Sequence, residues 1–240
     1  MQKQLNSKSI CYVELNTLLL PLGVIPSLFL LYLIIGEREG KFKEKSIIIV
    51  YIGGIILGSV IYIMEGMILY LMITGDVYLN LIIIFSFIFS FLDQLVKLAV
   101  LNLSALSDSG LPLYGASFSL GFSSVFAPLL FGRTLEVGLE NAMLVALPFS
   151  VMLINCSIGI IIGTGVKRNM RGKYFGLATV AGMIIWITVI ISIVYSLAGE
   201  SVISAIFSVC SIVISSFAFI TVYKKHLPYA MMDRRELRKL

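Results

Sequence analysis

A series of seven long apolar runs constrains this chain more than any other feature of its 240 residues. The runs fall at about 17–35, 47–73, 77–106, 114–131, 142–166, 174–197 and 202–223. A helix needs about 20 apolar residues to cross the core of a bilayer, whereas strands of a membrane barrel alternate over about ten residues. The runs therefore predict an all-α, multi-pass membrane protein with about seven transmembrane helices.

The composition indicates the same class of protein. Hydrophobic residues make up 59% of the chain and charged residues 13%, whereas a soluble domain is nearer to half apolar and a quarter charged. Seven spans with short connections leave no room for an independent soluble domain. We expect an N-terminal tail over 1–16, a membrane domain over 17–223 and a basic cytoplasmic tail over 224–240.

Lysine and arginine are distributed unevenly between the runs. The connections at 36–46 and 167–173 hold four each and the segment after 223 holds six, while 132–141 holds only Arg133. With the N-terminus outside, 14 basic residues lie inside and three outside, in line with the positive-inside tendency. The pattern predicts an external N-terminus, a cytoplasmic C-terminus and a place in the cell membrane.

Three ionisable side chains fall inside the runs, namely Glu65 in the second run and Asp93 and Lys97 in the third. A charge near the bilayer centre costs at least about 2.5–3.5 kcal/mol, so such residues usually face the protein interior and mark a site. Asp93 and Lys97 are four residues apart, share a helix face and can pair directly. The sequence leaves open whether this pair is structural or functional.

Glu65 lies nearer the outer end of its run and Asp93 nearer the inner end. The helical rise separates them in depth by on the order of 7 Å, so a pair of carboxylates sharing a proton is not expected, although contact stays open. Gln94 adds polarity to the third run and Asn155 to the fifth.

Small residues recur at four-residue spacing in three of the runs. They are Gly54 and Gly58, then Gly115, Ser119 and Ser123, and finally Gly159 and Gly163. Side chains of this size let two helices approach closely. Tight helix packing is sufficient to explain all of them, so they predict close helix contacts.

Two segments carry a more specific pattern, FLDQLVK at 91–97 and YGASFSLGFS at 114–123. They resemble the PrsW-type intramembrane peptidases, relatives of the CAAX prenyl endopeptidases, which carry an EExxK motif on one span and a YGaavGLGFAxxEN-like segment on the next. The resemblance implies a helical peptidase scaffold with a degenerate catalytic motif and a ligand or partner cavity. The motif would be Asp93, Gln94 and Lys97, and the cavity would be lined by Glu65, Tyr114, Gly115, Gly121, Phe122 and Asn155.

The chain departs from this family at the positions that carry chemistry. Asp93 stands in place of the first glutamate of the motif, and Gln94, which cannot take a proton, stands in place of the second. Phe126 and Ala127 occupy the positions of the Glu-Asn pair that the family places after the second segment. The resemblance therefore points to a catalytically degenerate member.

The histidines that the family places on later spans are also missing. Their positions would fall near Ser150 and Trp186, and the one histidine of the chain, His226, follows the last run. A general base or metal site of intramembrane Glu and His cannot be assembled from these residues. We therefore expect neither a metal nor another cofactor.

Three functions from different classes remain open. The favoured one is a non-catalytic protein that binds another membrane segment or a lipid-like ligand in the former active-site cavity. The second is a working peptidase with Asp93 as base and Gln94 as a donor to water or to an oxyanion. The third is a small transporter or a subunit of a membrane complex, with Glu65, Asp93 and Lys97 as a proton or ion path.

The charge distribution suggests the partners. The net charge is +5, and six basic residues follow the last run. Attraction to anionic lipid headgroups accounts for that segment at roughly 1 kcal/mol per basic residue near the surface, and a soluble partner is the alternative. No nucleotide-binding loop occurs, so membrane lipids and another transmembrane protein are expected as partners and nucleic acid is not.

Overall fold

The computed structural model describes residues 21–129 and 146–232, apart from 22, 37, 39, 41, 74–78 and 107. Within these residues the regular structure is helical, without a strand, so the all-α prediction is confirmed for this part of the chain. The expected N-terminal tail over 1–16 and the connection that holds Arg133 lie outside the described residues.

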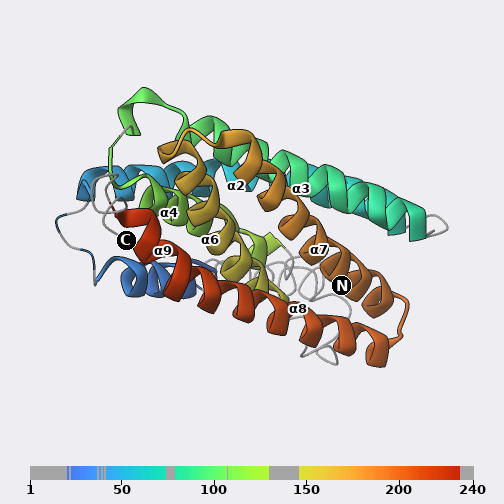
Figure 1. Cartoon of the computed structure of the whole chain (residues 1–240). Helices are drawn as coiled ribbons and strands as arrows, with labels where there is room; N and C mark the ends of the chain where they lie inside the picture. Colours follow the sequence, from blue (N-terminus) through green and yellow to red (C-terminus); the bar gives the residue numbers. More distant parts are fainter. Residues whose placement is uncertain are drawn as a thin grey trace, which may run out of the picture.

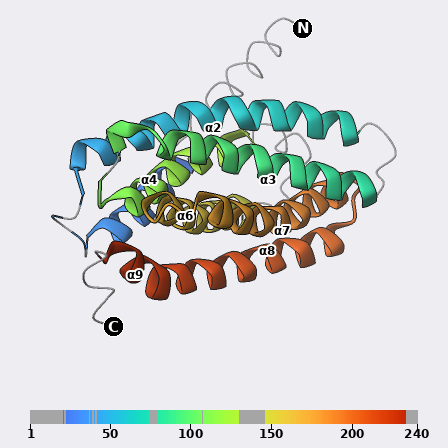
Figure 2. The same ribbon diagram turned by 45° about the horizontal axis from the view of Figure 1, so that its top comes forward.

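Figure 1 shows the helices in their order along the chain. After a first helix at Gly23–Ile35 come α2 (Glu44–Ile73), α3 (Leu79–Leu101), a 3-10 turn (Ser104–Leu106), α4 (Leu111–Ser124), α6 (Ala146–Lys167), α7 (Arg171–Leu197), α8 (Ser201–Thr221), a π-helical turn (Val222–His226) and α9 (Leu227–Met231). Neighbours along the chain run in opposite directions, and Figure 2 shows α2 and α3 on one side of α6 and α7 with α8 on the other.

Five of these helices are long and apolar enough to cross a membrane. They are α2, α3, α6, α7 and the continuous helix from α8 to α9. The predicted run at 114–131 contains most of α4, which has 14 residues and would span only about 21 Å, and, after a turn at 125, further helical residues at 126–129. The described part of the first run, Gly23–Ile35, is similarly short. The described residues thus support a multi-pass helical membrane protein with five full-length spans, and the count of seven stays a prediction.

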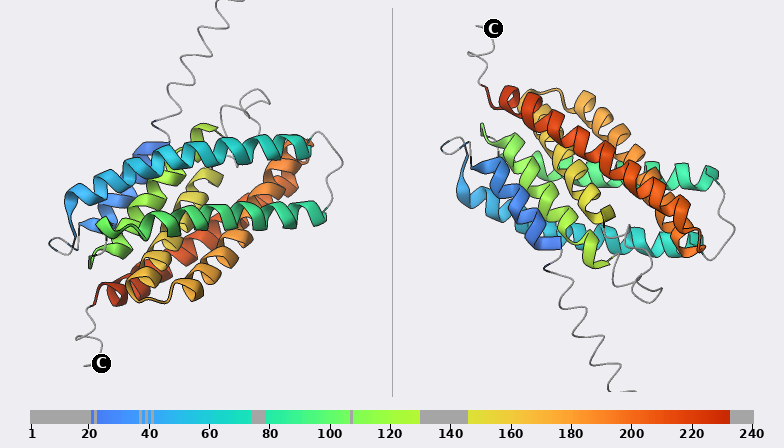
Figure 3. Two further views of the ribbon diagram at one scale, coloured as in Figure 1. Left: turned by 90° about the horizontal axis from the view of Figure 1, so that it is seen from above. Right: turned by 90° about the horizontal axis from the view of Figure 1, so that it is seen from below.

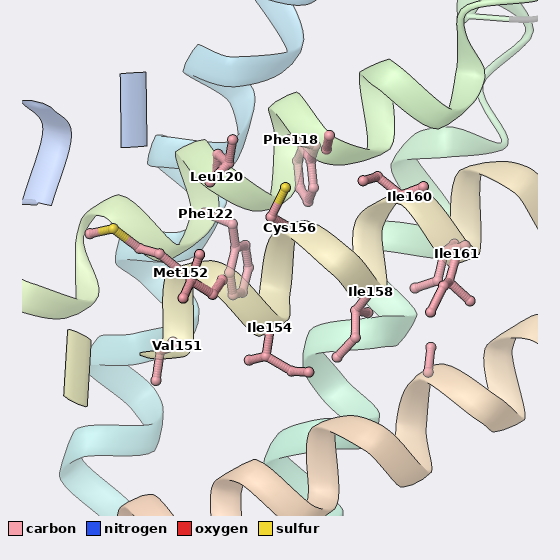
Figure 4. Close-up of a cluster of buried hydrophobic side chains, with 14 of the residues drawn as sticks. Phe118, Leu120, Phe122, Val151, Met152, Ile154, Cys156, Ile158, Ile160 and Ile161 are labelled. Carbon is pink, nitrogen blue, oxygen red and sulfur yellow. The ribbon is translucent and has the colours of Figure 1, made fainter. Parts of the chain in front are cut away.

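The short helix α4 lies at the centre of the bundle. Each of its residues is buried, and it packs mainly against α2 and α6. Because α4 is surrounded by other helices, it meets protein rather than lipid along its length. In Figure 4 its side chains Phe118 and Phe122 face Met152 and Cys156 of α6.

Small residues permit this close packing, as their spacing predicts. A Cβ added to Gly115 of α4 would overlap the carbonyl oxygen of Gly159 of α6, and the reverse is also true. A Cβ on Gly54 or Gly58 of α2 would likewise collide with the backbone of α4. The prediction of close helix contacts at these residues is confirmed.

Serines line the inner face of α8. Its buried residues are Ser204, Ser208, Ser211 and Ser215, while Val202, Val213 and Phe217 point outward. The Ser192 hydroxyl of α7 lies 2.7 Å from that of Ser208, and the Ser150 hydroxyl of α6 lies 2.7 Å from that of Ser211. A helix with a polar inner face and an apolar outer face suits lipid surroundings, where small polar residues hold helices together.

Three basic segments lie at one end of the bundle. Lys167 Nζ donates to the Ala230 carbonyl at 2.9 Å, and Arg168 donates to the Tyr229 carbonyl at 3.0 Å. The Arg38 guanidinium lies 5.2 Å from the centre of the Tyr223 ring. The connections predicted to share one side of the membrane therefore share one end of the molecule, and which side that end faces stays a prediction.

Residue 223, after which the basic tail is expected to begin, lies within a helix. The helix continues through Val222–His226 into α9, whose Leu227 and Ala230 are buried against the bundle. The basic residues Lys224 and Lys225 therefore belong to the helical body. The apolar run ends where Lys224 and Lys225 begin, although the helix does not end there, so the sequence pattern did not predict the continuation.

Candidate functional site

Five polar side chains from three helices meet in the interior of the bundle. They are Glu65 on α2, Asp93, Gln94 and Lys97 on α3, and Asn155 on α6. All five are buried, and Lys97 has no exposed surface at all. We call the three ionisable residues, Glu65, Asp93 and Lys97, the buried ionic cluster.

The residue spacing of α3 explains why its polar side chains reach this place. The buried residues of α3 recur every three or four positions, and Asp93, Gln94 and Lys97 are among them. This face packs on α7 and α6, while Phe91 and Leu95 point outward. Polar residues on the inner face and apolar residues on the outer one are what a lipid-facing helix requires.

Lys97 is held by amide oxygens. Its Nζ donates to Gln94 Oε1 at 3.0 Å and to Asn155 Oδ1, and it lies 5.1 Å from the centre of the Phe122 ring. The predicted direct pair with Asp93 is not formed among the described residues, although the two charges interact electrostatically. The amides of Gln94 and Asn155 provide closer acceptors, so the ammonium is turned toward them.

Asp93 has one satisfied and one unsatisfied oxygen. Trp186 Nε1 of α7 donates to Asp93 Oδ2 at 3.2 Å, while Oδ1 is buried without a hydrogen-bond partner. Asp93 also borders a cavity of about 10 Å³, which has room for one water molecule. The cavity is lined by Asp93, Gln94, Val151, Ile154, Asn155, Ile158, Gly182, Ile185 and Trp186.

Glu65 joins the cluster from α2. Both of its carboxyl oxygens are buried and neither has a hydrogen-bond partner. The carboxyl group interacts electrostatically with Asp93 and with Lys97. Glu65 therefore lies close enough to Asp93 and Lys97 for their charges to interact, without a hydrogen bond to either residue.

An aromatic shell surrounds the cluster. The Tyr62 ring lies 5.0 Å from that of Phe122, 5.2 Å from Phe126 and 6.2 Å from Trp186. Trp186 also lies 5.3 Å from Phe89. All five rings are buried in the bundle. Tyr62 and Phe89 are not among the site residues that the sequence predicts. The only signal for them is that Tyr62 precedes Glu65 by three residues, which places both on one helix face.

Three residues predicted to line the cavity lie elsewhere. The Tyr114 hydroxyl accepts from the Lys43 backbone N–H at 2.9 Å and donates to Asp108 Oδ2 at 2.8 Å, near the basic end. Gly115 meets the backbone of α6, and Gly121 meets that of α2. Both glycines lie at helix contacts, and neither they nor Tyr114 are among the residues that border the cavity beside Asp93. Of the predicted cavity residues, Glu65, Phe122 and Asn155 belong to the site.

Trp186 offers a direct optical test of this geometry. It is the only tryptophan of the chain and is 7% exposed, so its fluorescence reports on the site alone. We expect emission at short wavelength that an aqueous quencher does not reduce, and a spectral shift in Asp93→Ala, which removes the indole's acceptor. Asp108→Ala near the basic end should leave the spectrum unchanged. Emission typical of a water-exposed indole would contradict the burial.

The fold and the site together define a class, a multi-pass helical membrane protein with a buried ionic cluster enclosed by aromatic rings. In the described part of the chain, no three His, Cys, Asp or Glu side chains come close enough to hold a metal ion. No family model, curated protein or solved structure matches this chain.

Proposed function

We propose that this chain is a catalytically inactive membrane protein on a scaffold like that of the PrsW-type intramembrane peptidases. It resides in the cell membrane and binds another membrane segment or a lipid-like ligand. The observation that carries the proposal is that three positions expected to hold catalytic groups converge on one point, and two of them are occupied by aromatic rings.

The convergence involves residues far apart in the sequence. Asp93, at the first position of the motif, accepts a hydrogen bond from Trp186, at one of the expected histidine positions. The Trp186 ring lies 5.9 Å from that of Phe126, at the expected glutamate position. Ser150, at the other histidine position, instead contacts Ser211 of α8. Three of the four positions thus surround one site, which supports a shared scaffold.

The contents of the site argue against hydrolysis. Hydrolysis of a peptide bond needs space for the substrate as well as a positioned base and water. The cavity beside Asp93 has a volume of about 10 Å³, enough for one water molecule and far too small for a peptide. Phe126 and Trp186 occupy the positions expected for acid–base groups. The scaffold therefore keeps its helix packing but lacks the side chains that would catalyse hydrolysis.

The outer faces of α2 and α3 provide the surface through which a membrane partner would approach. α2 packs mainly on α4 and α3 mainly on α7, and the two make few contacts with each other (Figure 3). Their outward side chains are apolar, including Ile56 and Val60 on α2 and Phe87 and Phe91 on α3. This surface adjoins the site, since Glu65 and Asp93 lie on the inner faces of the same two helices.

Purified full-length protein in lipid nanodiscs tests the proposal. We expect no cleavage of a single-span test substrate, by the original chain or by Asp93→Ala. A photoreactive residue at Phe91 on α3 should crosslink to membrane proteins or lipid analogues more specifically than one at Phe217, an exposed aromatic position on α8. Cleavage that disappears in Asp93→Ala would overturn the proposal.

One observation favours a second candidate, an active peptidase of altered chemistry. The cavity that can hold one water is bordered by both Asp93 and Gln94, the base and the orienting donor of that mechanism. This function predicts that Asp93→Asn abolishes cleavage while Asp93→Glu preserves or increases it. Cleavage indifferent to both substitutions would exclude it.

A further inference from the structure

The buried ionic cluster has an uneven charge balance. It contains two carboxyl groups, Glu65 and Asp93, but one amine, Lys97. With all three ionised, the interior would carry one uncompensated negative charge. A buried charge without a partner is strongly unfavourable, and a group in that position usually changes its protonation state instead.

The surrounding helices supply no further charge among the described residues. α2 adds the phenol of Tyr62, α4 adds the ring of Phe122, α6 adds the amide of Asn155 and α7 adds the indole of Trp186. All of these groups are neutral. Within the part of the chain that the structure describes, the excess charge is therefore balanced inside the cluster itself, and a bound proton is the smallest ligand that balances it.

The two carboxyl groups differ in their surroundings. Asp93 Oδ2 accepts the Trp186 N–H, and Asp93 borders the space for one water molecule. Neither oxygen of Glu65 has a hydrogen-bond partner. Hydrogen-bond donors favour the charged form of a carboxyl group, and their absence favours the neutral form. The anionic state therefore suits Asp93, and the protonated state suits Glu65.

We propose that the buried ionic cluster is a binding site for one proton, which Glu65 carries, so that a neutral carboxylic acid on α2 faces the charges of Asp93 and Lys97 on α3. The binding step is simple addition of a proton to one carboxyl oxygen, and no bond to another atom breaks. This site goes beyond the proposed binding function and does not depend on whether the protein is a peptidase relative.

Infrared spectroscopy of the full chain in nanodiscs at neutral pH tests the site directly. A protonated carboxyl group has a C=O stretch separate from that of a carboxylate, and the band moves on exchange into deuterium oxide. Charge balance predicts one such group in the original chain. It predicts none in Glu65→Gln and none in Asp93→Asn, since Glu65 and Lys97 then neutralise each other.

The same infrared measurement serves for a control variant and for assigning the band to a residue type. Asp108→Asn, near the basic end, should leave the band unchanged because Asp108 is not part of the cluster. Isotopic labelling of glutamate carboxyl groups should shift the band, whereas labelling of aspartate should not. A shift with labelled aspartate, no band in the original chain, or a band that persists in either cluster variant would each overturn the proposal.

Stability provides a second readout that does not depend on the spectrum. The glutamine side chain introduced by Glu65→Gln has the shape of a neutral carboxylic acid, so this variant should fold and unfold at nearly the temperature of the original chain. If Glu65 were instead an anion paired with Lys97, the same change would leave the ammonium with one fewer counter-charge. A large fall in unfolding temperature in Glu65→Gln would therefore contradict a protonated Glu65.

Discussion

Lys97→Met is expected to cause the largest loss of stability of any single side-chain replacement in the site. The change removes the one amine of the buried ionic cluster and leaves Glu65 and Asp93 together in the interior. Removing one partner of a buried charge pair typically costs about 3–5 kcal/mol. The Gln94 and Asn155 oxygens that accept from Lys97 also lose their donor. Thermal unfolding in detergent, followed by Trp186 fluorescence, measures the effect.

Two further variants separate charge from packing in this experiment. Lys97→Met combined with Asp93→Asn leaves no charge of either sign that needs a partner, and should recover part of the lost stability. Lys43→Met is a matched control, because Lys43 is 71% exposed and lies 3.8 Å from Asp108. An exposed pair of this kind is worth about 0–1 kcal/mol. Equal stability of Lys97→Met and Lys43→Met would show that the cluster is not electrostatically important.

The same substitution, glycine to alanine, is expected to have opposite effects at two kinds of site. At Gly115 or Gly159 the added methyl group collides with the facing backbone of α6 or α4. The backbones cannot yield as a side chain would, so we expect a loss of about 1–3 kcal/mol or more. Thermal unfolding of each purified variant gives the comparison.

Gly53 and Gly176 provide the matched controls. Each is on a helix, and a methyl group there meets nothing within 4 Å. Alanine is favoured over glycine inside a helix by about 1 kcal/mol, so these two variants should be as stable as the original chain or more so. A similar loss of stability at all four positions would contradict the close contact between α4 and α6.

Residue spacing along the third apolar run correctly predicted which side chains lie on the inner face of α3. The spacing of Asp93, Gln94 and Lys97 placed them on one helix face, and all three are buried on that face. The contact of Gly115 with Gly159 could not be predicted in this way. Small residues at four-residue spacing predict a close helix contact but do not indicate which helix is the partner. Local pattern thus predicted which side chains face inward.

The partners of those side chains came from elsewhere in the chain. Lys97 bonds to Asn155, which is 58 residues away, and Asp93 bonds to Trp186, which is 93 residues away. Neither Asn155 nor Trp186 lies near α3 in the sequence. Their contacts depend on how α6 and α7 tilt and rotate against α3, and no residue spacing within one helix encodes that rotation.

The amino-acid sequence was sufficient to establish the class of the protein. The free energy of transferring a segment from water into lipid depends on the residues of that segment alone. Apolar length predicted the helices, and the distribution of lysine and arginine grouped the connections that share one end of the bundle. Two outcomes became visible only in the folded chain: α4 is a 14-residue helix at the centre of the bundle, and Glu65 lies within electrostatic range of Asp93 and Lys97. Those outcomes depend on packing between helices, which is a property of several segments together.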